Sequence, residues 1–358
     1  MMGILYALPA GFLILAAVLL IRSPGKPRPF PNTDKKEIAE SISEKTFVEI
    51  NDVRQGMFVR GKNKNNPVIL FVHGGPGMPE YFLAEKYMAK VEEKFTVCYW
   101  EQRGSGLSYQ SDSACKSVTT EQLISDIIAV TDYLCKRFGR EKIYLMAHSW
   151  GTFPGIQAAA RAPELYHAYI GMAQVSKQQE SEKMAYRYML SQYIANGNQV
   201  KARKLKDYSA YLMNLPLRDE TMHDLGIGTM HSMKSVFTGI FLPVMQCRAY
   251  TLAEKINIWR GKSALNRMTD LRRQMNEADM IRKVPELTIP VYFFSGIYDY
   301  TVSYILAESY FKQLQAPVKG FYLFRQSAHS PVFEEPEKAV CIMLEDVLAG
   351  KTSFGDIK

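Results

Sequence analysis

Short continuous runs of apolar residues alternate along the chain with longer stretches in which apolar residues recur at helical spacing. Because strands that alternate with helices form parallel sheets with helices on both faces, this order predicts an α/β fold with a mostly parallel central sheet. Residues 47–50 and 57–61 additionally predict antiparallel edge strands. The buried strands are expected over residues 68–75, 95–104, 143–149, 168–174, 290–296 and 321–324. The helices are expected over residues 120–138, from the end of the third buried strand to about 161, 303–315 and 335–348.

The pattern changes between residues 176 and 285, where no convincing strand occurs. The segments 181–195, 200–213 and 264–283 have helical periodicity, and the region is rich in methionine and tyrosine, which suit adaptable apolar surfaces. The sequence therefore predicts an all-helical insertion. Ligands of open α/β folds bind at the C-terminal edge of the sheet, and the position of the insertion favours a cap over that edge. A helical face without a role in substrate binding is the alternative.

The first 21 residues contain no charged side chain, and a helix of that length spans about 31 Å, close to the thickness of a bilayer core. We expect a single-pass transmembrane anchor at residues 1–21 and a tether at 22–45, rich in proline and basic residues. A cleaved signal peptide is the alternative, but no basic residue precedes the run and no A-x-A site follows it. The basic residues Arg22, Lys26 and Arg28 follow the run, which places the rest of the chain in the cytoplasm.

Charge and cysteine content exclude several classes of function. The 358 residues include 44 Lys and Arg against 36 Asp and Glu, a net charge of +8. Part of this excess lies beside the N-terminal apolar run, and no zinc-finger, RNP or basic-zipper pattern occurs, so we expect no nucleic-acid partner. The five cysteines are widely spaced, and neither H-E-x-x-H nor a G-x-G-x-x-G after a strand occurs. We therefore expect no metal site and no other cofactor.

A serine follows the third buried strand and precedes a helix, in the sequence Ala147-His148-Ser149-Trp150-Gly151. This pattern is typical of a nucleophile elbow, in which a serine lies on a tight strand-to-helix turn and small residues flank it. The first position is usually glycine, and Ala147 stands there instead. We expect Ser149 to be a nucleophile.

A glycine-rich segment, His73-Gly74-Gly75-Pro76-Gly77, directly follows the first buried strand. Glycine allows the backbone to approach a substrate oxygen closely. We expect the backbone amides of Gly75 and Trp150 to form an oxyanion hole. A tight turn that is rich in glycine for structural reasons is the alternative.

A serine hydroxyl needs a base, and in the α/β-hydrolase order the acid and the histidine follow the serine along the chain. Asp299 follows the strand expected at 290–296, and His329 follows the strand expected at 321–324. We therefore expect a triad in which Ser149 attacks, His329 accepts its proton and Asp299 orients the imidazole. A surface carboxylate and a packed histidine are the alternatives for the last two.

These segments together resemble the proline iminopeptidases, which are serine peptidases of α/β-hydrolase fold. The resemblance is carried by the HGGPG motif at 73–77, WEQRGSGLS at 100–108, AHSWG at 147–151 and SAHSP at 327–331, and it covers about residues 46–175 and 287–348. Glu101 stands where the family has aspartate. The resemblance implies release of an N-terminal residue, typically proline, from a peptide, amide or arylamide.

In that family, acidic groups near the cap hold the free amine of the substrate. The acidic residues of the cap include Glu180, Glu182, Asp219, Glu220 and Asp224, and none of these five matches a family motif. A solvated helix charge is the simpler interpretation of each.

The expected organisation is a catalytic domain at residues 46–175 and 286–358 with a helical cap at 176–285. We expect a serine hydrolase that acts on a small peptide or acyl substrate, and aminopeptidase activity is the leading assignment. A carboxylic ester or lipid hydrolase at the membrane surface is one alternative. A binding or regulatory protein without turnover is the other.

Overall fold

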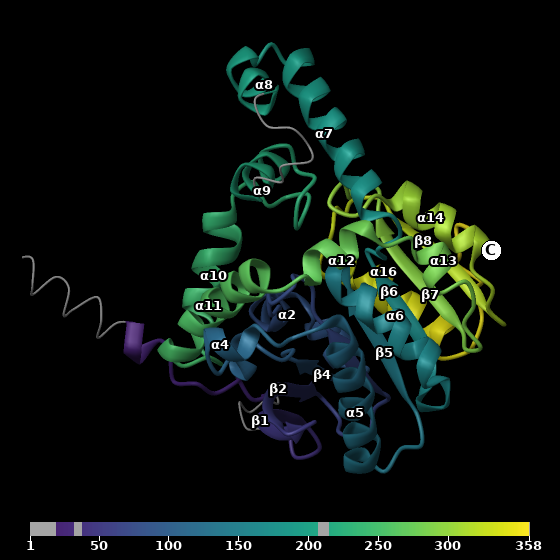
Figure 1. Cartoon of the computed structure of the whole chain (residues 1–358). Coiled ribbons are helices and arrows are strands. Elements are labelled where there is room, and N and C mark those ends of the chain that lie inside the picture. Colours follow the sequence, from purple (N-terminus) through teal and green to yellow (C-terminus); the bar gives the residue numbers. More distant parts are fainter. Residues whose placement is uncertain (1–18, 32–37, 207–214, 358) are drawn as a thin grey trace, which may run out of the picture.

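A computed structural model describes residues 19–31, 38–206 and 215–357, and the sheet at its centre has eight strands in the order β1-β2-β4-β3-β5-β6-β7-β8 (Figure 1). Strands β3 to β8 pair in parallel, whereas β2 pairs antiparallel with both β1 and β4. The expectation of a mostly parallel α/β sheet is thus confirmed. The strands are β1 Ile42–Ile50, β2 Val53–Gly61, β3 Val68–Val72, β4 Thr96–Trp100, β5 Ile143–His148, β6 Tyr166–Met172, β7 Val291–Gly296 and β8 Lys319–Phe324.

The inner strands are continuous apolar runs because both faces of the sheet are covered. Every residue of β3, β4, β5 and β7 is buried. Successive side chains of a strand point to opposite faces. Leu70 and Val72 of β3 accordingly join the cluster that includes Leu123 of α5, while Ile69 and Phe71 join the cluster on the other face.

Helices lie on both faces of the sheet. Helices α5 and α6 run side by side over one face (Figure 1). Helix α5 begins at the N-cap Thr119, whose side chain accepts a hydrogen bond from Gln122 N, and ends at Gly139 in left-handed conformation. The helices outside the inserted segment are α2 Tyr81–Tyr87, α3 Ala89–Glu92, η1 Gly106–Ser108, α4 Asp112–Cys115, α5 Thr120–Phe138, η2 Ser149–Gly151, α6 Thr152–Arg161, η3 Pro163–Leu165, α14 Tyr304–Gln313, α15 Pro331–Glu334, α16 Pro336–Ile342 and η5 Met343–Val347.

Between β6 and β7 the described residues of the chain form helices. Figure 1 shows α7 and α8 projecting away from the sheet, with α9 beside them and α10 and α11 returning toward α2 and α4. The helix expected over 264–283 is broken into three, because the backbone at Thr269 and Ala278 is extended. The helices are α7 Gln178–Ala195, α8 Gln199–Lys206, α9 Leu215–Asp224, η4 Phe237–Phe241, α10 Leu242–Gln246, α11 Leu252–Met268, α12 Leu271–Glu277 and α13 Met280–Lys283.

The expected membrane location is corrected by this structure. Over residues 19–31, 38–206 and 215–357, no helix has both the length and the apolar character that crossing a membrane requires. Most of the expected anchor, residues 1–18, lies outside the described residues. Leu19, Leu20 and Ile21 are helical, and a turn follows at Arg22. The cytoplasmic placement, which was inferred from the basic residues after the expected anchor, has no support without it.

Residues that follow the N-terminal segment contact the body of the protein. Ser23 is buried and its hydroxyl accepts a hydrogen bond from Lys255 Nζ at 2.8 Å. Gly25 N donates to the carbonyl of Arg248, and the Arg60 guanidinium lies over the ring of Phe30. Strand β1 begins at residue 42, inside the range expected to be a tether. Part of the segment at 22–45 is therefore packed against α11 and the first strands.

A buried carboxylate ties α5 to the loop after β4. Asp126 is fully buried, and its two oxygens accept hydrogen bonds from Arg103 Nε at 2.7 Å and from an Arg103 terminal nitrogen at 2.9 Å. Asn51, Gln55 and Gln122 donate to the same carboxylate. Removal of one partner of such a pair leaves an uncompensated buried charge.

We expect Asp126→Ala to lower the free energy of unfolding by about 3 kcal/mol, because Arg103 and Gln55 lose their acceptor. The half-exposed Asp132 pairs with Lys136 on the helix surface, so Asp132→Ala is the matched control and should cost less than about 0.5 kcal/mol. Urea titrations followed by circular dichroism measure both values. Equal losses in the two variants would contradict this account of Asp126.

Candidate active site

Ser149 lies on a strained turn between β5 and α6. Its φ is 54°, in the left-handed region that side chains other than glycine rarely adopt. The turn packs so closely on β3 that a Cβ at Gly151 would lie 2.3 Å from the carbonyl oxygen of Val72. Ala147 is tolerated because Gly155 faces it, where an added Cβ would lie 2.9 Å from the Cβ of Ala147. Small residues are thus required on both sides of Ser149.

Asp299 and His329 meet in a hydrogen bond at the ends of β7 and β8. Asp299 Oδ2 lies 2.9 Å from His329 Nδ1, and both side chains are buried. Asp299 Oδ1 accepts hydrogen bonds from the backbone amides of Thr301 and Val302, each at 2.9 Å. These bonds fix the carboxylate, which in turn places the histidine proton on Nδ1 and leaves Nε2 as an acceptor.

A cavity of about 190 Å³, the Ser149 cavity, brings the expected site residues together. Ser149, Trp150, Gly75 and His329 all contribute to its lining; Asp299 stands behind His329. Gly75 has a φ of 129°, and a Cβ there would lie 2.4 Å from Gly77 N. Glycine is therefore required at this point of the loop, as the HGGPG motif indicates.

Residues of the WEQRGSGLS motif connect the loops around the site through hydrogen bonds. Gln102 donates from its side chain to the carbonyl of His73 at 2.6 Å and accepts from the indole of Trp150 at 3.2 Å. Gln102 N donates to His73 Nε2, and burial lowers the pKa of His73 to about 4. His73 is therefore a neutral structural histidine.

Glu101, which stands where the resemblance implies aspartate, is also buried. Its carboxyl contacts the Tyr250 hydroxyl and accepts a hydrogen bond from Leu107 N at 2.6 Å. Burial raises the pKa of Glu101 to about 8. The side chain links the loop after β4 to the helical segment 176–285.

Sequence reasoning missed an ion pair beside Ser149, between Glu80 and His148. Glu80 Oε2 lies 2.8 Å from His148 Nδ1, and His148 Nε2 lies 2.8 Å from the carbonyl oxygen of His329. Both ring nitrogens face acceptors, so both carry hydrogen. Burial lowers the pKa of His148, but Glu80 outweighs this and raises it above the ordinary value. Glu80 Oε1 also accepts from Gly74 N at 3.2 Å. The pair therefore connects three loops of the site.

Two of the five acidic residues named above, Glu182 and Asp219, face the Ser149 cavity. Both are among its lining residues, whereas Glu220 and Asp224 line a second, larger cavity, which Asp219 also lines. Glu180 is exposed and pairs with Lys183. The interpretation of all five as solvated helix charges is therefore wrong for Glu182, which is buried.

No group of three or more histidine, cysteine or carboxylate side chains that could hold a metal ion occurs in the described part of the chain. The geometry around Ser149 offers a hydroxyl, a histidine–carboxylate pair and backbone amides, which are the components of acyl transfer.

Comparison with known proteins agrees with this geometry. A family model described as "alpha/beta hydrolase fold" matches residues 67–336. The chain belongs to this family. The protein is accordingly a hydrolase.

Among curated proteins, the chain is similar to the "Probable aminopeptidase YbaC" of Bacillus subtilis (strain 168), with 29% identity over 305 residues that cover 83% of this chain and 94% of the relative. A crystal structure of a proline iminopeptidase-related protein of Thermus thermophilus is similar, with a TM-score of 0.57 and 19% identity over 86% of this chain and 98% of that one. The proline iminopeptidase of Mycobacterium smegmatis has a TM-score of 0.59 and 16% identity, with 86% and 98% covered. These relatives agree with the resemblance seen in the sequence.

We expect Glu80→Gln to lower the melting temperature in a pH-dependent way. The pKa of His148 is raised in the folded protein, so its contribution is present below its ordinary pKa of about 6.5 and is lost as pH rises through the raised value. The pKa of Glu80 is lowered mainly by His148 against the effect of burial, so its contribution is lost as pH falls below its ordinary value of about 4.3. The difference from wild type should therefore be largest between about pH 4.5 and 6.5.

Differential scanning calorimetry across pH 4 to 9 measures this difference. Glu93→Gln, which alters an exposed carboxylate paired with Lys62, is the matched control and should show a small difference at every pH. A Glu80→Gln difference that grows as pH rises above 7 would have the wrong sign for this ion pair.

Proposed function

We propose that this hydrolase is a serine hydrolase that cleaves an acyl bond through an acyl-enzyme at Ser149, and that its leading activity is that of an aminopeptidase of proline iminopeptidase type. The observation that carries the proposal is the hydrogen bond between Asp299 and His329 at the wall of the cavity that contains Ser149 on its strained turn.

The proposed reaction has two steps. Ser149 Oγ attacks the carbonyl carbon, His329 Nε2 accepts the serine proton, and Asp299 stabilises the imidazolium. The amides of Gly75 and Trp150 hold the oxyanion. The leaving amine or alcohol then takes the proton from His329, and the acyl-enzyme remains. Water attacks this ester with His329 as base, which releases the acid and restores Ser149.

We propose that residues 46–175 and 286–358 form the catalytic domain and that residues 176–285 cap it. This is supported by the walls of the Ser149 cavity, because the helical segment supplies a large part of its lining. These lining residues include Glu182, Arg218, Met222, Lys262, Arg272 and Met275.

The name of the Bacillus subtilis relative supports the aminopeptidase assignment. An aminopeptidase must hold the free amine of its substrate. Glu182 and Asp219 provide carboxylates at the cavity, and the side-chain oxygen of Gln178 is buried there with no hydrogen-bond partner. These three groups are the candidates for amine recognition.

Ester hydrolysis is the second candidate, and one observation favours it. Arg218 engages Glu182 with two hydrogen bonds, at 2.6 and 2.7 Å, and Asp219 with a third at 3.1 Å. Carboxylates that are already paired attract an amine less strongly, whereas a neutral acyl substrate does not need them.

Replacement of the reacting groups tests the mechanism. Ser149→Ala should abolish turnover, and Asp299→Asn should lower kcat by about 10³- to 10⁴-fold, because the imidazole loses its orientation and its charge stabilisation. Ser113→Ala, at an exposed serine, is the control and should retain activity. Initial rates with purified protein measure these effects, and full turnover by Ser149→Ala would refute the nucleophile assignment.

The leading activity is tested by comparison of proline 4-nitroanilide with its N-acetyl derivative on the full chain. We expect kcat/KM for the free amine to exceed that for the acetylated compound by at least about 100-fold, since the acetyl group removes the charge that the carboxylates bind. Equal cleavage of both compounds, or cleavage of 4-nitrophenyl esters alone, would replace the aminopeptidase with the ester hydrolase.

A further inference from the structure

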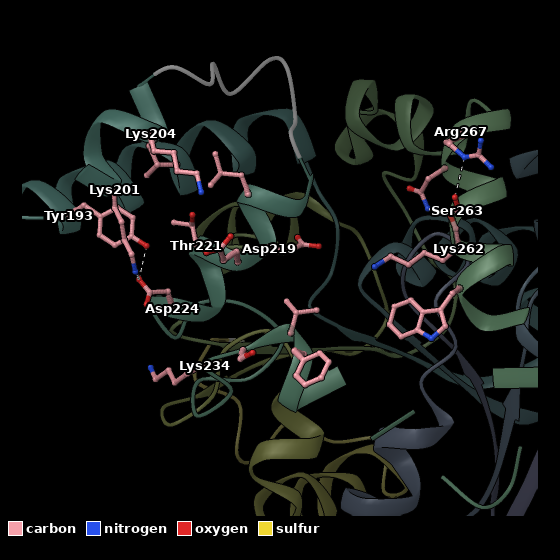
Figure 2. A pocket seen from close by; sticks show the side chains of 18 residues that line it. Tyr193, Lys201, Lys204, Asp219, Thr221, Asp224, Lys234, Lys262, Ser263 and Arg267 are labelled. Atoms are coloured by element: carbon pink, nitrogen blue, oxygen red, sulfur yellow. Dashed lines mark hydrogen bonds and ion pairs between the residues drawn. The ribbon is translucent and has the colours of Figure 1, made fainter. Parts of the chain in front are cut away.

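A second cavity adjoins the Ser149 cavity. This outer cavity has a volume of about 900 Å³, and its walls come from α7, α8 and α9 on one side and α11 on the other (Figure 2). Asp219, Val236 and Lys262 line both cavities. These three residues therefore lie at the junction of the two cavities.

Two cationic side chains face the Ser149 cavity near this junction. Lys262 projects from α11 toward the wall that carries Asp219 and Thr221 (Figure 2). Arg272, on α12, donates from Nε to Asn266 at 2.8 Å and from a terminal nitrogen to the carbonyl of Gly75 at 3.3 Å. The second contact places the guanidinium beside the proposed oxyanion loop. In the described part of the chain, neither cation has a carboxylate within ion-pair distance.

The carboxylates of this region are engaged elsewhere. Glu182 and Asp219 both pair with Arg218. The part of the Ser149 cavity formed by the helical segment therefore contains three cations, Arg218, Lys262 and Arg272, against two carboxylates. Burial lowers the pKa of Lys262, and the nearby Asp219 offsets only part of this effect. Burial and the nearby Arg218 lower the pKa of Arg272 against the attraction of Asp219 and Glu182. Lys262 and Arg272 are half-buried, and neither forms an ion pair with a carboxylate of the described residues. Such sites favour an anionic ligand, because it offsets the cost of removing the cations from water.

We propose that Lys262 and Arg272 bind a carboxylate of the substrate, a second group distinct from the acyl bond that Ser149 cleaves. This inference rests on the proposed function and narrows its substrate class to short molecules with a free carboxylate. The two groups lie near one another, because Ser149 and Lys262 both line the Ser149 cavity. A short peptide with free termini meets both requirements, since its amine can approach the unpartnered side-chain oxygen of Gln178 while its carboxylate lies against Lys262.

Calorimetric titration of the full-length Ser149→Ala variant tests the proposal, because this variant binds without turnover. Two pairs of probes differ only in the acidic group: prolyl-phenylalanine and its C-terminal amide, and 4-phenylbutyrate and 4-phenylbutyramide. We expect the acid of each pair to bind at least about tenfold more tightly than the amide, as one charge-assisted hydrogen bond provides. Adding Lys262→Met should remove most of this preference, and adding Lys262→Arg, which keeps the charge, should retain it.

Lys204→Met is the matched control, because Lys204 lines the outer cavity but not the Ser149 cavity. It should leave the preference unchanged. Equal binding of acid and amide in both pairs, no binding of either acid, or an undiminished preference after Lys262→Met would each overturn the proposal. The phenylbutyrate pair separates this outcome from a failure of the aminopeptidase assignment, since neither compound has an amine or a peptide bond.

Discussion

The backbone turn at Ser149 is the constraint on which the rest of the site depends. A residue with a φ of 54° is held in that conformation only if its surroundings fix the chain on both sides. Here β5 is buried in the sheet before the turn, and Gly151 packs against the carbonyls of Val72 and His73 after it. The close approach brings the end of β3 beside the end of β5, so the HGGPG loop and the serine share one cavity.

Hydrogen bonds between loops then fix the positions of the loops around Ser149, which the sheet alone does not determine. Gln102 joins the HGGPG loop to Trp150, and Arg103 joins the following loop to α5 through Asp126. Glu80 and His148 connect the same glycine loop to the backbone of His329. Gln102 and Arg103 of the WEQRGSGLS motif therefore hold the loops around the site in place, and neither is proposed to react.

Much of this arrangement was predictable from the sequence because it depends on local patterns. Helix α5 lies at 120–138 as predicted, since its cap at Thr119 and its glycine stop are both local signals. Asp299 and His329 follow strands, and parallel strands end at one edge, so their meeting follows from topology. The break in the helix expected at 264–283 was missed because the periodicity continues through Thr269.

Contacts between residues distant in sequence left no such signal. Glu80 and His148 are separated by 68 positions, and neither position has a pattern that identifies the other. The pairing of Glu182 with Arg218, and the position of Lys262 between two cavities, depend on how the helices of the segment 176–285 pack. An apolar run at the N-terminus indicated a membrane location from composition alone, and the helices of the described residues do not support it.

Covalent labelling tests the central claim of this account most directly. The full-length protein is treated with a fluorophosphonate, and the modified peptide is mapped by mass spectrometry. A serine activated by a histidine–carboxylate pair reacts far faster than an ordinary surface hydroxyl. The account predicts a single stoichiometric adduct on Ser149, formed much more slowly when Asp299 is replaced by asparagine. The absence of an adduct, or an adduct on another serine, would contradict it.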